Sequence, residues 1–240
     1  MQRYFLTQEE YDNDIILDNN FHHMKNVLRM KKNDKFIINY NRLTFLCSIL
    51  EINNDHITYS KDEELEENNE LDNHITLIMG FPKNDKLDLI IQKSVELGVS
   101  KIILVYMERS VVKYTQEKTN KKLERYKKII KEASEQSRRN ILPEILEVKS
   151  LKEIDYNQFD KLFLCYENEN KLDLKTKLKD IKNYSNIGFI VGPEGGISNK
   201  ELDFFHNLEI DQISLGKRIL RCETAPLYLL SVLGYELEQY

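Results

Sequence analysis

The sequence has few of the residues that mark unusual chains. Its 240 residues include only eight glycines and four prolines, which excludes collagen-like and low-complexity chains. No apolar run approaches the ~18 residues that a membrane-spanning helix needs. The first residues reach acidic positions before any apolar stretch of signal-peptide length. We therefore expect a cytoplasmic protein with no membrane partner.

Cysteine is also scarce. Cys47, Cys165 and Cys222 are odd in number, far apart and without paired spacing, which excludes a disulfide framework and a zinc knuckle and fits a reducing compartment. The conspicuous pair His22-His23 has no cysteine or carboxylate at ligand spacing on the same helical face. We predict no metal site.

Charge is plentiful, but its sum is misleading. The net charge is −5, yet the run 62–72 holds seven acids and no base, and the stretch 113–139 holds ten Lys and Arg against four Glu. Ionic screening over about 8–10 Å makes such local blocks matter more than the total. The basic stretch is either a surface for nucleic acid or a solvated helix face, and charge alone does not separate the two.

The acidic run also separates two patterns, so we predict domains at 1–72 and 73–240. The first is small and rich in strands. The second alternates strands and helices, which indicates βαβ units, a parallel sheet and an α/β domain. The predicted helices are 19–28, 85–97, 117–139 and one beginning near 224, and the predicted strands are 35–40, 43–52, 56–60, 75–79, 101–106, 145–148, 161–166, 187–191 and 212–215.

Two loops that follow strands of the second domain could bind a ligand, because open α/β sheets place ligands beyond the carboxyl ends of their strands. Residues 191–198 form a glycine-rich loop, and Ser198 with Glu201 predicts a capping box and a helix start. Residues 215–226 place three cations beside Gly216, which suits phosphate or carboxylate recognition. We predict that Thr224 caps the last helix. Each stretch could instead be an ordinary turn or surface loop.

A third strand end, at Leu164-Cys165-Tyr166-Glu167, is weaker. Cys165 is better interpreted as a small buried apolar residue than as a nucleophile. At the end of the long helix, Gln136, Arg138, Arg139 and Asn140 form a dense set of planar hydrogen-bonding groups. Arginine stacks on bases and binds phosphates, so a role facing RNA is physically sensible.

Together these motifs resemble the bacterial 16S rRNA uridine N3-methyltransferases, the small-subunit rRNA methyltransferase E type of the SPOUT superfamily. The resemblance runs nearly from end to end of the chain. It rests on Arg3-Tyr4-Phe5, His22-His23 with Val27-Leu28-Arg29, Lys93–Val99, Glu135–Arg139, Gly192–Gly196 and Leu215–Ala225.

The resemblance implies an N-terminal PUA-like β-barrel that binds RNA and a parallel-sheet domain with a C-terminal trefoil knot. It implies a homodimer that methylates N3 of a uridine in 16S rRNA, in the assembled 30S subunit, with S-adenosylmethionine as cofactor. The barrel of that family commonly has a glycine-containing hairpin turn, where this chain has Tyr40-Asn41-Arg42. Asn41 tolerates the left-handed conformation. The acidic run is interpreted as compositional drift.

Carried onto this sequence, the resemblance predicts a cofactor pocket formed by Leu164, Cys165, Tyr166, Gly192, Pro193, Glu194, Gly195, Gly196, Leu215, Gly216, Ile219 and Leu220. Predicted RNA contacts are Arg3, His22, Arg29, Arg139, Lys217, Arg218 and Arg221.

The reaction itself suggests one catalytic group. N3 of neutral uracil carries a proton, so an arginine near O2 and O4 would stabilise the anion that forms when the proton leaves. We predict Arg138 for this role, with Arg221 second. Glu194 or Glu223 could accept the proton, or could anchor loop backbone. Open alternatives are a catalytically inactive ribosome-assembly factor and a SPOUT methyltransferase acting on tRNA. A nucleotide-dependent dehydrogenase is the most remote.

Overall fold

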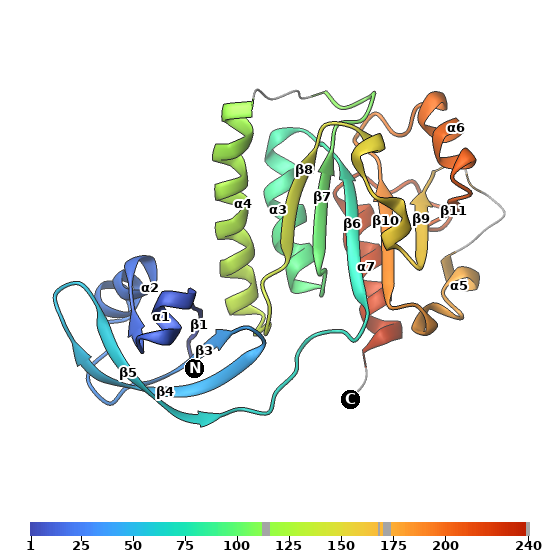
Figure 1. The fold of residues 1–240 in the computed structure, drawn as a ribbon. Helices are drawn as coiled ribbons and strands as arrows, with labels where there is room; N and C mark the ends of the chain where they lie inside the picture. Colours follow the sequence, from blue (N-terminus) through green and yellow to red (C-terminus); the bar gives the residue numbers. More distant parts are fainter. Residues whose placement is uncertain (112–115, 168, 170–173, 239–240) are drawn as a thin grey trace. The chain divides into compact units, whose positions relative to one another are not determined.

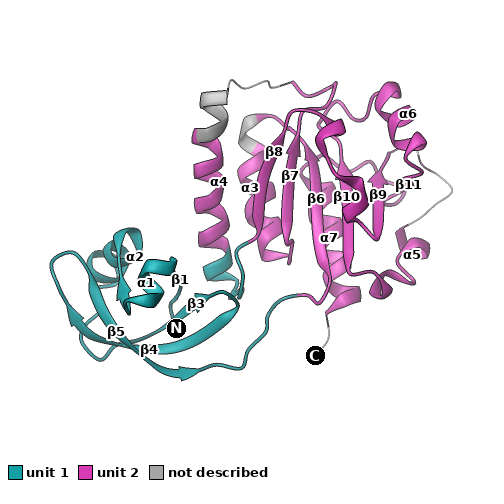
Figure 2. Cartoon of the chain, viewed as in Figure 1, with its two compact units in different colours: residues 1–70, 134–142 teal, residues 71–133, 143–240 magenta. Residues whose placement is uncertain are grey.

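The computed structural model describes residues 1–111, 116–167, 169 and 174–238 (Figure 1). The chain forms two compact units (Figure 2). Unit 1 comprises residues 1–70 together with 134–142, and unit 2 comprises 71–133 and 143–240. The boundary predicted between 72 and 73 lies close to the first of these junctions. Residues 134–142, far along the chain, pack with unit 1.

Unit 1 is built on a curled five-stranded sheet in the order β1-β3-β4-β5-β2. β1 pairs with β3 in parallel, and the other pairs are antiparallel. Its core includes Tyr4, Phe36, Ile38 and Tyr59. The elements are β1 (Arg3–Phe5), α1 (Gln8–Asp12), β2 (Ile15–Ile16), α2 (Asp18–His22), the π-helical turn η1 (His23–Val27), β3 (Lys35–Tyr40), β4 (Leu43–Ile52) and β5 (Ile57–Glu64).

Three short elements of unit 1 were not predicted, namely β1, α1 and β2. The three residues of β1 are too few for a periodic pattern, and pairing with β3 places them. The predicted helix 19–28 is instead α2 followed by the π-helical turn, which ends before Arg29 at φ 54°. β5 continues to Glu64, so the start of the acidic run is strand rather than linker.

Unit 2 contains the predicted parallel sheet, which has six strands in the order β11-β9-β10-β6-β7-β8. Its strands are β6 (His74–Gly80), β7 (Lys101–Val105), β8 (Glu144–Val148), β9 (Lys161–Cys165), β10 (Asn186–Val191) and β11 (Asp211–Ile213). Its helices are α3 (Asn84–Glu96), α4 (Gln116–Gln136, whose last turn belongs to unit 1), α5 (Leu174–Lys177), α6 (Asn199–Asn207), α7 (Thr224–Leu237) and the 3₁₀ turns η2 (Leu151–Glu153), η3 (Tyr156–Gln158) and η4 (Ile181–Asn183).

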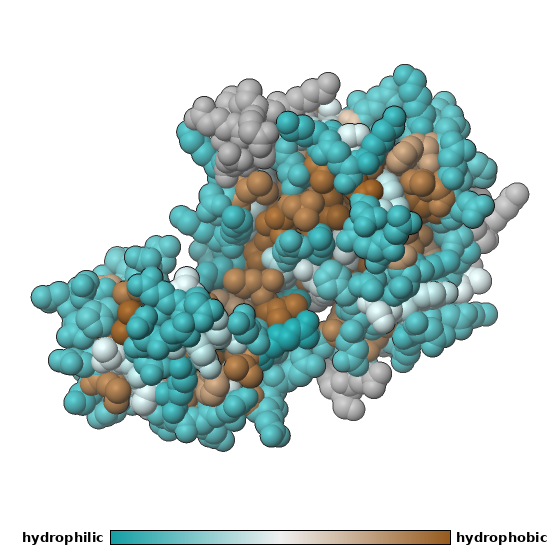
Figure 3. Space-filling model, viewed as in Figure 1, coloured by the Kyte–Doolittle hydropathy of each residue, from teal (hydrophilic) through white to brown (hydrophobic). Residues whose placement is uncertain are grey.

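Both faces of this sheet are covered. α3, α4 and α7 pack on one face around a large apolar cluster that includes Leu77, Phe163 and Leu229. On the other face, η2, η3 and α6 enclose a smaller cluster around Ile190 and Phe205. Because the two clusters lie on opposite faces of the sheet, alternate side chains along a strand enter different cores. Figure 3 shows apolar residues at the surface of unit 2 on the viewed side.

Helix ends agree with the sequence in part. The capping box of Ser198 and Glu201 is confirmed. Gly98, just after α3, has a positive φ, as is common where a helix ends. α4 ends at Gln136 rather than at residue 139, because Arg138 takes the left-handed conformation that terminates helices. Thr224 is the first residue of α7 and not its cap. The cap is Glu223, whose side chain makes no capping hydrogen bond.

Two further properties concern what the described residues lack. None of the described helices has the length and apolar character that crossing a membrane requires. Within the same part of the chain, no three His, Cys, Asp or Glu side chains come together in a way that could hold a metal ion.

Candidate active site

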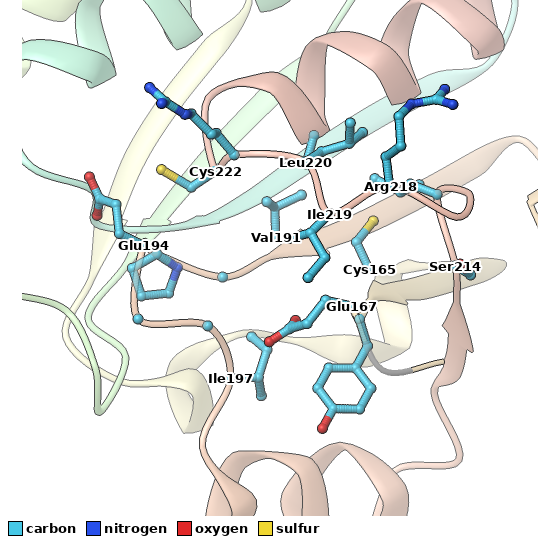
Figure 4. Close-up of a pocket in the computed structure, with 18 of the residues that line it drawn as sticks. Cys165, Glu167, Val191, Glu194, Ile197, Ser214, Arg218, Ile219, Leu220 and Cys222 are labelled. Carbon is cyan, nitrogen blue, oxygen red and sulfur yellow. The ribbon is translucent and has the colours of Figure 1, made fainter. Parts of the chain in front are cut away.

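A cavity of about 550 Å³ lies at the carboxyl ends of β9, β10 and β11, three neighbouring strands of unit 2 (Figure 4). Its size is within the range of small-molecule sites, roughly 300–1,000 Å³. Three loops contribute to it, after β9, after β10 and after β11. The sequence predicted these same three strand ends, and parallel pairing brings them to one edge of the sheet.

The glycine loop after β10 forms one wall. Gly196 has φ +70°, a conformation that L side chains rarely adopt. A Cβ atom there would lie 2.8 Å from Oε1 of Glu167, so a side chain would meet the opposite wall. Arg109 supports the loop from outside, since its Nη1 donates to the Gly195 carbonyl at 3.0 Å. The loop therefore presents backbone, rather than bulky side chains, toward the cavity.

Large apolar side chains of the lining come from the segments at the ends of β10 and β11. Val191, Ile197, Leu215, Ile219 and Leu220 contact the cavity. Ile219 is 82% exposed, so its apolar side chain is accessible to a ligand in the cavity. Figure 4 shows Glu167 reaching the middle of the cavity between Ile219 and Ile197. Among the described residues, Glu167 makes no hydrogen bond or ion pair.

A second group of charged side chains lies at the end of the cavity marked by Glu194 and Cys222 in Figure 4. Lys86, in the first turn of α3, places its Nζ 2.8 Å from Glu223 Oε2 and 3.4 Å from Glu194 Oε1. The Cys222 thiol donates to Glu223 Oε2 at 3.3 Å. We refer to Lys86, Glu194, Cys222 and Glu223 as the Lys86 cluster. The cluster joins three segments, namely α3, the glycine loop and the loop that leads into α7.

The ionisation of the cluster follows from these contacts. The hydrogen bond from Lys86 is the largest cause that lowers the pKa of Glu223, to about 2. Burial raises the pKa of Glu194, but hydrogen bonds from the backbone and from Lys86 outweigh burial and lower it. Burial raises the pKa of Cys222 to about 12, and burial does the same for Cys165. Both thiols are therefore protonated and weakly nucleophilic near neutral pH.

The predicted cofactor residues lie together, with one correction. Cys165, Tyr166, Gly192 to Gly196, Leu215, Gly216, Ile219 and Leu220 line the cavity. Leu164 does not. It is fully buried in the smaller core cluster, because successive side chains of β9 alternate between the two faces of the sheet.

Five of the predicted RNA-binding residues are exposed, and they fall into two groups. Lys217, Arg218 and Arg221 are exposed at the mouth of the cavity. His22 and Arg29 are exposed in unit 1, on either side of the π-helical turn. Their surface positions are compatible with phosphate contact, and the prediction stands for these five.

Arg3 and Arg139 require a correction, because both are only 3% exposed. Arg3 forms an ion pair with Glu67, and Arg139 Nε donates to Glu70 Oε2 at 3.0 Å. Both carboxylates belong to the acidic run, which is therefore not compositional drift: two of its acids neutralise buried arginines. We assign no phosphate contact to Arg3 or Arg139.

Arg138, predicted to be catalytic, is exposed in unit 1 at φ 61° and does not line the cavity. Its carbonyl accepts a hydrogen bond from Asn69 Nδ2 at 3.0 Å. Among described residues, its guanidinium makes no hydrogen bond or ion pair. The catalytic role stays a prediction.

Sequence reasoning missed Lys86, Glu167 and Ser214 as lining residues. Lys86 lies about a hundred residues before the loops that it joins, and one lysine in a helix carries no local signal. Glu167 lies in the third strand end that the sequence singled out, but it was not among the residues predicted to contact the cofactor.

Family comparisons agree with the two units. A model described as an RNA methyltransferase domain matches residues 69–234, and one described as an RNA methyltransferase PUA domain matches residues 16–59. A Bacillus subtilis protein named ribosomal RNA small subunit methyltransferase E is 36% identical, over 99% of this chain and 98% of its own length. A protein of the same name from Mesomycoplasma hyopneumoniae is 31% identical, with coverages of 96% and 98%.

Solved structures agree as well. A Neisseria gonorrhoeae ribosomal RNA small subunit methyltransferase E bound to S-adenosylmethionine superposes with a TM-score of 0.84 at 29% identity, over 98% of this chain and 97% of that one. A putative methyltransferase from Legionella pneumophila, also in complex with this cofactor, has a TM-score of 0.84 at 27% identity, with the same coverages.

Proposed function

The chain belongs to the ribosomal RNA small subunit methyltransferase E family, and on that premise we propose that it methylates N3 of one uridine in 16S rRNA. It is an S-adenosylmethionine-dependent rRNA methyltransferase with a PUA-type RNA-binding domain. The observation that supports the proposal most is the single cavity at the ends of β9, β10 and β11, which contains eleven of the twelve residues predicted to contact the cofactor.

The residues of the cavity fit S-adenosylmethionine. Its volume suits a ligand of nucleoside size, and the glycine loop would let backbone approach that ligand without side-chain obstruction. Glu167 is the lining carboxylate that no described cation neutralises, so we propose that it contacts the positively charged cofactor. The negative charge of Glu194, in contrast, is balanced by its ion pair with Lys86. When bound, the cofactor supplies a methyl group already activated by its sulfonium.

The protein's contribution is alignment and electrostatics. Glu223 is a weak base because Lys86 holds its pKa near 2, and Glu194 is ionised but hydrogen-bonded to the same ammonium. Neither suits removal of the N3 proton, so the proton acceptor is left unassigned. We keep Arg138 as the proposed donor to the uracil oxygens, because its guanidinium is exposed and makes no described bond.

Two finer features of the fold complete the proposal. We propose that the C-terminal segment is threaded as a trefoil knot. In support, residues 214–222 leave the edge strand β11, line the same cavity as the loops after β9 and β10, and continue into α7, which contacts α3.

We propose a homodimer as the second feature. α7 presents an apolar stripe at helical spacing, with Tyr228 41% exposed, Val232 partly buried and Tyr235 86% exposed. A stripe of this kind marks an interface between proteins. Size-exclusion chromatography with light scattering measures the mass directly, and Tyr235→Glu is expected to shift it toward a monomer.

Methylation is tested with labelled S-adenosylmethionine and 30S subunits purified from cells that lack this protein. We propose the assembled particle as the substrate, so protein-free 16S rRNA and bulk tRNA are assayed in parallel. Nucleoside mass spectrometry is expected to find 3-methyluridine in 16S rRNA from the 30S reaction. Cofactor binding without transfer to any RNA would favour an inactive assembly factor, and methylated tRNA alone would favour the tRNA enzyme.

A further inference from the structure

Unit 1 contains a hollow of about 490 Å³ that the proposed chemistry does not use. One wall is the hairpin between β3 and β4, and the other is formed by residues 140–142 of the segment 134–142, with Phe5 and Leu6 completing the lining. Figure 2 shows this segment in the colour of unit 1, beside that hairpin. Two parts of the chain separated by about a hundred residues thus meet around one concave site.

Buried hydrogen bonds fix the two walls to each other. Asn39 Nδ2 donates to the Arg139 carbonyl at 2.7 Å, and Asn140 Nδ2 donates to Thr44 Oγ1 at 2.9 Å. Asn39, Thr44 and Asn140 are each at most 4% exposed. The hollow is therefore a preformed feature of the folded unit.

The hairpin turn carries a residue in an unfavourable conformation. Asn41 and Arg42 have φ values of 46° and 69°, as both central residues of a type I′ turn require. Asparagine followed by glycine is the favoured pair, since a side chain at the second position is strained. This chain keeps an arginine there, at the rim of the hollow. A strained residue beside a cavity points to a use for its side chain.

The chemistry of the hollow fits a nucleotide. Arg42 is exposed and, among described residues, forms no hydrogen bond or ion pair. A guanidinium binds phosphate in a bidentate manner. Ile141 and Leu142 provide an apolar surface, with Leu142 45% exposed, on which the flat face of a base can pack.

The charge of unit 1 sharpens this assignment. The unit carries fifteen Asp and Glu against ten Lys and Arg, so its net charge does not favour RNA. Because screening makes local charge matter more than this total, the exposed guanidinium of Arg42 can still bind a phosphate. We propose that the hollow binds one unstacked nucleotide of the rRNA substrate, with its phosphate on Arg42 and its base against Leu142. The inference rests on the proposed function and adds a specific subsite to it.

The decisive variant is Arg42→Gly, which removes the cation and relieves the turn. We expect the melting temperature to rise by a few degrees, while KM for 30S subunits rises about fivefold or more. kcat and KM for S-adenosylmethionine are expected to stay within about twofold of wild type. Arg42→Lys keeps the charge and the strain, so its KM is expected to lie between those of wild type and Arg42→Gly.

Asn33→Gly is the matched control, because Asn33 is exposed at φ 72° in the same unit but outside the hollow. It is expected to leave KM for 30S subunits unchanged. Leu142→Glu tests the base contact by placing a carboxylate in the hollow, and it is expected to raise the same KM. If the wild-type enzyme is active and both Arg42→Gly and Leu142→Glu have the same KM for 30S subunits as wild type, the hollow is not an RNA site. Wild-type protein that transfers no methyl group contradicts the proposed function instead.

Discussion

Lys86 Nζ lies 2.8 Å from Glu223 Oε2, and this contact joins the first turn of α3 to the loop that leads into α7. The same ammonium reaches Glu194 in the glycine loop at 3.4 Å. The side chains are 31%, 17% and 22% exposed for Lys86, Glu223 and Glu194, so the ions are only partly screened by water. One lysine therefore sets the spacing of two cavity loops.

Replacing Lys86 with methionine should weaken cofactor binding. The two carboxylates would repel each other and the loops would separate, so we expect Kd for S-adenosylmethionine to rise about tenfold. Lys86→Arg should restore most of the affinity. Calorimetric titration of the purified protein measures both.

Two comparisons identify the cause. Lys93→Met removes a lysine from the same helix that pairs with Glu96 at 2.8 Å, and it should leave Kd unchanged. S-adenosylhomocysteine lacks the sulfonium charge of S-adenosylmethionine. If Lys86→Met acts by moving the loops, it should weaken the binding of both ligands equally. An effect of Lys86→Met confined to one of the two ligands would show that charge, rather than loop spacing, is what Lys86 controls.

The depressed pKa of Glu223 predicts a dependence of stability on pH. Its folded pKa is about 2, below the ~4.3 of an unfolded glutamate. The ionised group thus stabilises the fold above about pH 4.5, and that contribution is lost as pH falls toward 2. Wild type should melt higher than Glu223→Gln at pH 6, and the difference should shrink to near zero at pH 2. A difference in melting temperature that is constant across this range contradicts the assignment.

Gly80 and Gly234 should respond in opposite directions to alanine. A Cβ at Gly80 would lie 2.6 Å from Pro193 Cδ and 2.9 Å from Pro193 N, so Gly80→Ala must displace the glycine loop. We expect it to destabilise the protein by about 1–3 kcal/mol and to weaken cofactor binding. Gly234, inside α7, has no atom within 4 Å of that position, so its alanine variant should gain about 0.5–1 kcal/mol. Urea denaturation monitored by circular dichroism compares the two.

Arg139 should matter for stability rather than for RNA contact. Its removal leaves Glu70, whose side chain is 8% exposed, without its cation, and breaking a buried pair costs about 3–5 kcal/mol. Arg139→Met is therefore expected to unfold at much lower urea concentration. Adding Glu70→Gln should recover part of the loss, since the amide oxygen still accepts from Asn140 N. If Arg139→Met is as stable as wild type, the ion pair is not structural.

Arg138 provides the contrast at the neighbouring position. Its side chain is exposed, so Arg138→Ala should change the free energy of unfolding by less than about 0.5 kcal/mol. If the guanidinium stabilises the uracil anion, the rate at saturating cofactor and 30S subunits should fall about 100-fold or more. Full methylation by a variant that binds cofactor normally would exclude Arg138 from catalysis.

Local sequence patterns were sufficient to predict those elements whose structure depends mainly on their own residues. The strands from β6 to β11 were all placed from short apolar runs, and Ser198 with Glu201 signalled the start of α6. The three loops that line the cavity were recognised because their glycines and cations directly follow strands, and parallel pairing forces such ends to one edge.

What the sequence determined by itself was therefore the fold class, the family and the loops of the cavity. Only the tertiary structure decided the roles of single charges, because an ion pair depends on partners that lie far apart in the chain. Arg139 and Arg138 are adjacent in sequence, yet one is buried against Glu70 and the other is exposed. Lys86 looked like any helix lysine until folding brought it between Glu194 and Glu223. The electrostatic free energy of a charged side chain depends on its burial and on its distance from other charges, and neither can be determined from the sequence alone.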